Sequence, residues 1–250
     1  MSFSYFCECN VISPSLERFD PGQRSEKIRV YVVNVNSLSH ARRSPKKLRT
    51  EVRRDQIAQA ALALIAQRGL NELNIGALAK EVRVVPSAIY RHYAHKDAVL
   101  ESVLDLISNS LLENVKVVRD ETPDSLEQLH LLLQRHIRLV RHHAGIPRVI
   151  FSEQIFAGNA RRRHRINKII SAYLGEIAGI VTEGQNAGRI RPDLSANSAA
   201  VMFLGLVQPA IILWLMSNQT FDVAGHAEQA WVLFHEMLET RTRFQVFHRL

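Results

Sequence analysis

Apolar residues recur at helical spacing along this chain from about residue 49 to its end. In residues 51–68 they fall at intervals of three and four, on one face of a helix that Gly69 ends. No segment after residue 40 reads as a convincing strand. The pattern predicts an all-α fold of about nine helices. The later helices are expected at about 122–143, 145–156, 162–187, 195–217 and 222–240.

Two short helices joined by a tight turn follow the first helix. Asn74 is placed to cap the helix at residues 75–82, whose apolar residues have the spacing i, i+3, i+4, i+7. After a turn of about three residues, Pro86 occupies the first position of the next helix. Ile89 and Tyr93 point inward from it, and we expect Tyr93 to be an ordinary core aromatic residue. The arrangement is a helix-turn-helix.

The outward face of the third helix is small and polar. A helix of this kind fits the major groove of DNA, where its first side chains reach base edges. Ser87 can exchange a hydrogen bond with a base, Ala88 permits close approach, and Arg91 can bind guanine or a phosphate. A fourth helix is expected to begin near Lys96.

The excess of positive over negative side chains lies in this region. The whole chain has a formal net charge of +8, and residues 40–96 hold twelve Lys and Arg against four Asp and Glu. Such a block favours a polyanionic partner, because neutralised phosphates give affinity without any sequence match. A charge-rich, solvated surface is the alternative.

Residues 53–101 resemble the DNA-binding region of the TetR/AcrR family of transcriptional regulators. The resemblance rests on the run Arg54–Ala61, on Gly69, on Leu78-Ala79, and on Ile89-Tyr90-Arg91-His92-Tyr93 followed by Lys96. The last run corresponds to the family signature LYxHFxxK with conservative changes at two positions. The turn departs from the family's Gly-Val-Ser and reads Arg83-Val84-Val85. Arg83 stands where a left-handed backbone is often needed, at a cost of about 1 kcal/mol.

The resemblance implies a domain organisation and a set of DNA-binding residues. Residues 1–46 would be a flexible extension with a basic arm, 47–96 the helix-turn-helix domain, and 97–250 a helical effector-binding and dimerisation domain. Phosphate contacts are implied for Asn74, Tyr90, His92 and Lys96. The full set is Arg53, Arg54, Asn74, Pro86, Ser87, Ala88, Tyr90, Arg91, His92 and Lys96.

Residues 194–221 contain no charged side chain, and residues 199–216 are nearly all apolar. A helix that is apolar all round is either a membrane span or buried among other helices. The family resemblance favours burial, because its last two helices usually pair with those of a second subunit. A homodimer on a palindromic operator, with no membrane partner, is therefore expected. The expected interface residues are Leu206, Trp214, Trp231 and Phe234.

A pocket for an unknown small-molecule effector is expected among helices four to seven. Its candidate residues, each of which has an ordinary core or surface role as its alternative, are His130, Gln134, Phe151, Gln154, Phe156 and Tyr173. The dense basic run at residues 161–165 opposes the dipole at a helix start. It is interpreted as a solvated loop or as a secondary anion site.

Motifs of enzymes and metal sites fail on inspection. The run at residues 235–239 begins like the zinc motif HExxH, but Glu239 replaces the second histidine. Cys7 and Cys9 lack partner ligands at zinc spacing, and such scarce thiols suit a reducing compartment. We therefore predict a cytoplasmic, nucleoid-associated regulator that is not an enzyme and needs no cofactor or metal. The alternatives are a nucleoid-occlusion-like DNA-binding protein of the same fold and a membrane-anchored binding protein.

Overall fold

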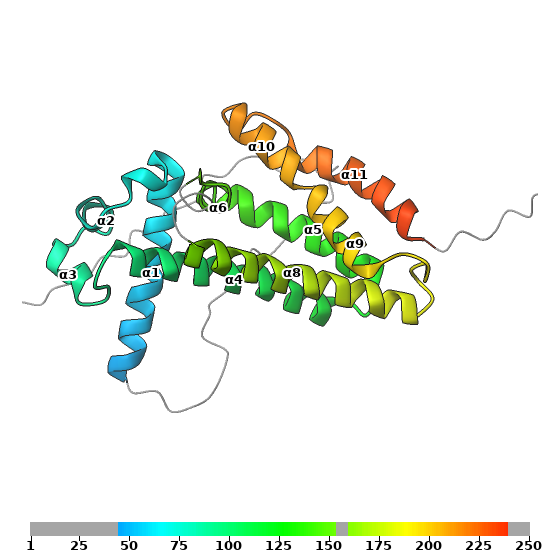
Figure 1. Cartoon of the computed structure of the whole chain (residues 1–250), viewed down its shortest axis with the longest axis horizontal. Helices are drawn as coiled ribbons and strands as arrows, with labels where there is room; N and C mark the ends of the chain where they lie inside the picture. Colours follow the sequence, from blue (N-terminus) through cyan, green and yellow to red (C-terminus); the bar gives the residue numbers. More distant parts are fainter. Residues whose placement is uncertain (1–44, 154–159, 240–250) are drawn as a thin grey trace, which may run out of the picture. The chain divides into compact units, whose positions relative to one another are not determined.

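The computed structural model describes residues 45–153 and 160–239 (Figure 1). Within them it contains ten α-helices, one 3-10 helix and no strand beyond an isolated bridge between Ile190 and Glu239. The predicted all-α fold is therefore confirmed. The elements are α1 (Pro45–Arg68), η2 (Leu70–Glu72), α2 (Ile75–Glu81), α3 (Pro86–Tyr90), α4 (Lys96–Glu121), α5 (Ser125–His142), α6 (Gly145–Ile150), α8 (Ala160–Asn186), α9 (Ala196–Gly205), α10 (Gln208–Met216) and α11 (Val223–Leu238).

Helix boundaries differ from the expectation at three places. Helix α1 begins at Pro45, so the last two residues of the expected extension are helical, while residues 1–44 lie outside the described part. The single helix expected at 195–217 is wrong, because α9 and α10 are separate. Pro209 has no N–H for the helical ladder, and Val207 instead closes a turn to the Leu204 carbonyl at 3.1 Å. Helix α6 ends at Ile150 rather than at residue 156.

The helix-turn-helix packs around a small core. Ile89 of α3 and Tyr93 behind it are 1% and 2% exposed, which confirms their predicted inward orientation. Helices α2 and α3 pack together, and α2 packs against α1. The α1 face predicted from periodicity is buried, except that Ala60 is only half-buried. This core fixes the angle at which α3 leaves the domain.

Two contacts join the helix-turn-helix to the helices that follow. Helix α4 is 26 residues long and packs against α1 as well as against α5 and α8. Helix α6 also packs against α1, and Gly145 makes this approach possible. A Cβ atom at Gly145 would lie 2.3 Å from the Leu62 carbonyl oxygen, which is closer than atoms can pack. The two predicted domains therefore share a continuous interface.

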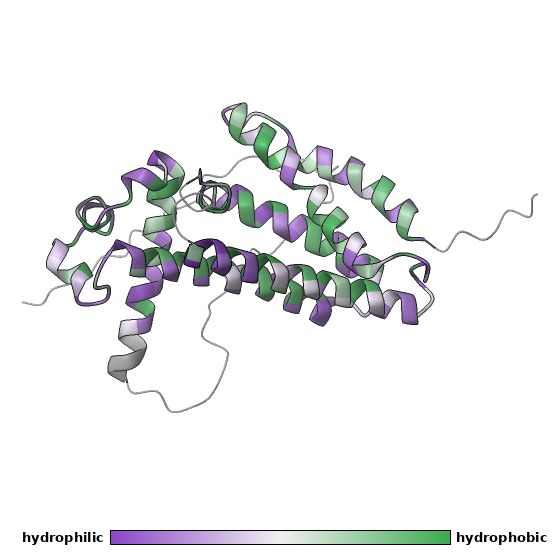
Figure 2. Cartoon of the chain, in the orientation of Figure 1, coloured by the Kyte–Doolittle hydropathy of each residue, from purple (hydrophilic) through white to green (hydrophobic). Residues whose placement is uncertain are grey.

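Helices α9 and α10 bury one side against their own chain and expose the other. Phe203, Val207 and Ala210 are fully buried, whereas Met202 and Met216 are half or more exposed. Figure 2 shows hydrophobic residues through both helices. In the described residues, the stretch Ala196–Met216 is the one segment long and apolar enough to cross a membrane by length and composition. A core helix of a soluble protein meets the same criterion, and the break before Pro209 interrupts this one.

Candidate nucleic-acid interface

Helix α3 presents the residues that the sequence predicts for base contact. Ser87, Tyr90 and Arg91 are exposed, Ala88 is half-buried and Ile89 is buried. Pro86 lies in the first turn, where its missing N–H costs nothing because that N–H has no partner within a helix. The exposed side chains therefore share the face of α3 that points away from the core.

The turn between α2 and α3 has the strained backbone that the sequence predicts. Arg83 has φ +58°, a left-handed conformation that glycine adopts at little cost and other residues rarely adopt. The Val84 N–H donates to the Ala79 carbonyl at 2.9 Å, which closes α2. Val85 is the N-cap of α3 and accepts no hydrogen bond with its side chain, as expected from the loss of the family's hydroxyl.

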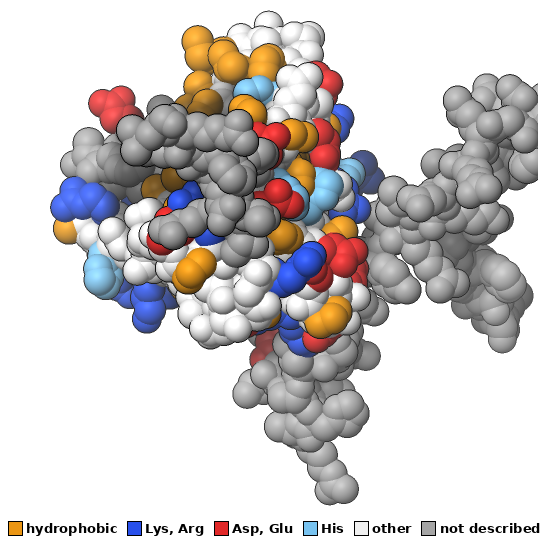
Figure 3. Space-filling model, turned by 90° about the vertical axis from the view of Figure 1, so that its right-hand side faces the viewer, with side chains coloured by type: hydrophobic (Ala, Val, Ile, Leu, Met, Phe, Trp, Pro, Cys, Tyr) orange, Lys and Arg blue, Asp and Glu red, His pale blue; other side chains and the backbone are white. Residues whose placement is uncertain are grey.

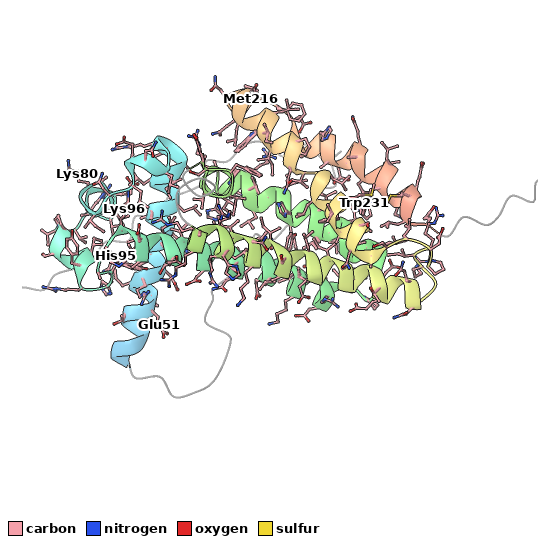
Figure 4. The ribbon with its side chains drawn as sticks, in the orientation of Figure 1. Glu51, Lys80, His95, Lys96, Met216 and Trp231 are labelled. Atoms are coloured by element: carbon pink, nitrogen blue, oxygen red, sulfur yellow. The ribbon has the colours of Figure 1, made fainter. Side chains whose placement is uncertain are left out.

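The starts of α2 and α4 are each stabilised by a side chain that caps the helix. The side-chain Oδ1 of Asn74 accepts from the Ala77 N–H at 2.8 Å, which confirms the predicted cap of α2. His95 caps α4, because its Nδ1 accepts from the Ala98 N–H at 3.2 Å. The sequence does not predict this cap, because histidine is not among the residues preferred at a helix N-cap. Lys96, exposed at the first position of α4, lies beside this cap (Figure 4).

Positive charge gathers around His92, at the end of the motif. Burial lowers the pKa of His92, and the cations Arg53, Arg54 and Arg91 lower it further. The three arginines of two separate elements therefore lie close enough to act on one imidazole. His92 is neutral at pH 7, so it can meet a phosphate as a hydrogen-bond donor rather than as a cation.

Arg53 and Arg54 are both exposed, and Arg54 also contacts side chains of its own chain. The Arg54 guanidinium lies 4.9 Å from the centre of the Tyr93 ring and reaches the Ser102 hydroxyl at 3.4 Å. The Tyr93 hydroxyl donates to the Arg54 carbonyl at 3.0 Å. Both arginines predicted for DNA contact are exposed, and Arg54 in addition packs on Tyr93 of its own chain.

Two of the residues predicted for the effector pocket, His130 and Gln134, lie together, and the other described ones, Tyr173 and Phe151, make different contacts. The amide of Gln134 donates to Glu228 at 3.1 Å, and the His130 ring contacts the same carboxylate at 2.8 Å. Tyr173 is buried against His136, with 3.1 Å between hydroxyl and Nδ1, while Phe151 is 41% exposed at the end of α6. Gln154 and Phe156 lie outside the described residues. Of the described candidates, His130 lines an open pocket.

An open pocket of about 670 Å³ lies where α5 begins, beside α11 and the turn after α8. His130 stacks on Trp231 at its wall, with ring centres 4.8 Å apart. Its lining residues are Asp124, Leu126, Glu127, His130, Gly188, Arg189, Trp231, His235 and Glu239. Within residues 45–153 and 160–239, no group of three or more His, Cys, Asp or Glu is arranged to hold a metal ion.

The aromatic residues predicted for a dimer interface face the interior of their own subunit. Trp214, Trp231 and Phe234 are 6%, 8% and 3% exposed, and Leu206 is half-buried. A different set of apolar side chains is exposed on α9, α10 and α11. Part of this set is visible as orange side chains at the top of Figure 3. This apolar face consists of Val201, Met202, Ile212, Leu213, Met216, Val232 and Leu233.

Comparisons with known proteins agree with this geometry. Residues 57–103 match the family model for bacterial regulatory proteins of the tetR family, and residues 107–237 match the C-terminal region of YsiA-like proteins. The chain is 26% identical over 168 residues to the fatty acid metabolism regulator protein of Bacillus subtilis, covering 67% of this chain and 86% of that one. It is 25% identical over 189 residues to the nucleoid occlusion factor SlmA of Vibrio vulnificus, covering 75% and 96%.

A solved structure has the same fold. The transcriptional regulator FadR of Bacillus subtilis, in complex with stearoyl-CoA, matches with a TM-score of 0.64 at 24% identity, covering 74% of this chain and 98% of that one. These relatives are regulators rather than enzymes. The C-terminal model alone spans more than half of the chain, and the N-terminal model covers the helix-turn-helix. The chain therefore belongs to the TetR family of bacterial regulatory proteins and is a DNA-binding transcriptional regulator.

Proposed function

We propose that this chain is a homodimeric repressor that binds a palindromic operator and leaves it when a small-molecule effector binds. The observation that carries the proposal is the outward face of α3. Ser87, Tyr90 and Arg91 are exposed there, and Arg53 and Lys96 are exposed on the elements at either side. Polar base-reading side chains flanked by cations are what recognition of duplex DNA requires.

The apolar face of α9, α10 and α11 supports the homodimer. Its side chains include Met216 and Leu233, which are 77% and 70% exposed in a single subunit. Contiguous exposed apolar surface of this kind marks an interaction site. A second copy would cover it and set two α3 helices about one DNA turn apart, roughly 34 Å, which requires an operator with two inverted half-sites.

The effector is assigned to the region of α4, α5 and α8. The relative FadR binds stearoyl-CoA in its solved structure, so long-chain acyl-CoA is the first ligand class to test. An effector that favours a splayed dimer lowers operator affinity by shifting the population of conformations. Such a regulator acts on chromosomal DNA in the cytoplasm.

A gel-shift titration with DNA from upstream of its own gene tests the proposal. We expect salt-sensitive binding that prefers one inverted repeat over a shuffled duplex, and release when stearoyl-CoA is added. Binding without sequence preference would overturn the operator assignment. Occupancy of many dispersed genomic sites would favour a chromosome-organising role, which the similarity to SlmA makes the second candidate.

Two substitutions separate base reading from phosphate binding. Arg91→Ala is expected to weaken the preferred operator by about tenfold and relax its preference, since a good base contact contributes about 1–3 kcal/mol. Lys96→Ala is expected to weaken all sequences alike and to lower the salt dependence by about one ion. An unchanged sequence preference in Arg91→Ala would remove Arg91 from the base-reading set.

A further inference from the structure

The basic run at the start of α8 is held by carboxylates of α4. Arg162 forms an ion pair with Asp97, and Arg165 forms one with Asp105. Both carboxylates belong to the first half of α4, and the Arg162 side chain is only 16% exposed. These two arginines are therefore neither a solvated loop nor a free anion site. Their pairing also offsets the unfavourable position of cations at a helix N-terminus.

Asp97 occupies a sensitive place for a DNA-binding protein. It follows Lys96 directly, in the first turn of α4 after the His95 cap. Its side chain is half exposed. A carboxylate next to a phosphate-binding lysine repels the DNA backbone, unless a cation compensates its charge. Arg162 is the cation that does so, and it comes from a different part of the chain.

The opposite ends of the same two helices are also paired, with reversed charges. Arg119 of α4 contacts Glu183 at 2.8 Å and Glu176 at 3.8 Å, both on α8. The N-terminal pairs therefore join the two helix starts, and the C-terminal pairs join the later turns. Because ion pairs lie at both ends of the contact, a shift of α8 along α4 breaks pairs at both ends. The register of α8 thus determines whether Asp97 remains paired with Arg162.

We propose that Arg162 is a positioning residue for DNA binding: its ion pair with Asp97 compensates a negative charge at the DNA-facing start of α4, so that the position of α8 controls DNA affinity. The proposal extends the proposed function, since α8 is part of the region assigned to the effector. An effector that displaces the start of α8 uncovers the Asp97 carboxylate beside the phosphate backbone. The DNA surface then loses affinity without any change in α3 itself.

A double-mutant cycle on Asp97 and Arg162 tests the proposal. The probe is a generic duplex at low salt as well as the operator, because repulsion of phosphates does not depend on sequence. Arg162→Gln is expected to weaken both by roughly fivefold, the effect of one uncompensated charge near the backbone. The combination Asp97→Asn with Arg162→Gln is expected to recover most of that loss, because the carboxylate is then absent.

Two controls keep the test specific. Lys168→Gln removes an equal charge from an exposed position of α8 and should leave affinity within about twofold, since an exposed cation away from the DNA contributes little. Arg162→Lys keeps the charge and should keep the affinity, while melting temperatures confirm that every variant is folded.

Equal losses in Arg162→Gln with and without Asp97→Asn would overturn the proposal, because Arg162 would then act on DNA directly. A loss in Lys168→Gln as large as that in Arg162→Gln would overturn it too. Failure to find an operator would instead count against the proposed function, since the generic duplex still reports on the ion pair.

Discussion

The exposed surface around α3 and the apolar face of α9, α10 and α11 differ in their chemistry and in the part of the sequence that forms them. The surface around α3 is polar and basic, and it is built from residues close in sequence, between Arg53 and Lys96. The surface of α9, α10 and α11 is apolar and comes from three helices. Polar side chains can remain hydrated until DNA arrives, whereas exposed Met and Leu favour a lasting cover. The contrast agrees with the two proposed partners, DNA that binds reversibly at one surface and a second subunit that stays bound at the other.

The largest test of this contrast is to place charge in the apolar face. Leu233→Glu should convert the dimer into a monomer, because a buried, unpaired carboxylate costs several kcal/mol at each symmetric copy. Operator affinity should then fall by about a hundredfold or more, since two linked half-site contacts become one. Sedimentation velocity and gel-shift titration measure the two effects.

Asn109→Glu is the matched control for that substitution, because Asn109 is an exposed polar residue on α4, outside the apolar face. It should leave the dimer intact. A Leu233→Glu protein that sediments as a dimer with full operator affinity would contradict the assignment of this face.

Most of the correct predictions rest on residues that lie close together in the sequence. The cap at Asn74, the helix start at Pro86 and the left-handed Arg83 each depend on residues within a few positions. The inward turn of Ile89 and Tyr93 follows from helical spacing alone. Short-range chemistry of this kind determines the structure wherever the tertiary contacts agree with it.

Long-range packing decided what the sequence could not predict. Helices α9 and α10 are apolar on all sides, so their periodicity gives no inward direction. Trp214 was therefore expected at the interface but faces the interior. The pairing of Arg162 with Asp97 joins positions 65 residues apart, and no local pattern announces it.

A smaller test concerns His136 in the interior, one of three histidines with a lowered pKa in the described residues. Complete burial lowers the pKa of His136 to about 4. The unfolded chain binds this proton near pH 6.5 and the folded one does not, so stability is lost as pH falls from about 6.5 to about 4. Between pH 7 and pH 5 the loss from this residue is about 2 kcal/mol.

His136→Gln keeps a polar partner for Tyr173 and removes the titration. Its free energy of unfolding should depend less on pH than that of the wild type, by about 2 kcal/mol between pH 7 and pH 5. Urea denaturation at the two pH values measures this. Identical pH dependence in the two proteins would mean that His136 takes up its proton in the folded state.

The smallest expected effect lies in the turn that positions α3. Arg83 adopts φ +58°, which a Cβ atom disfavours and glycine tolerates. Arg83→Gly should therefore be more stable than Arg83→Ala by about 1 kcal/mol, or about 2–4 °C in melting temperature. Both variants remove the same charge, so they should bind DNA equally if the turn serves only as a hinge between α2 and α3. Equal melting temperatures would show that the left-handed conformation is not populated in solution. Weaker binding by Arg83→Gly alone would show that the backbone restriction imposed by a Cβ atom at this position holds α3 at its angle.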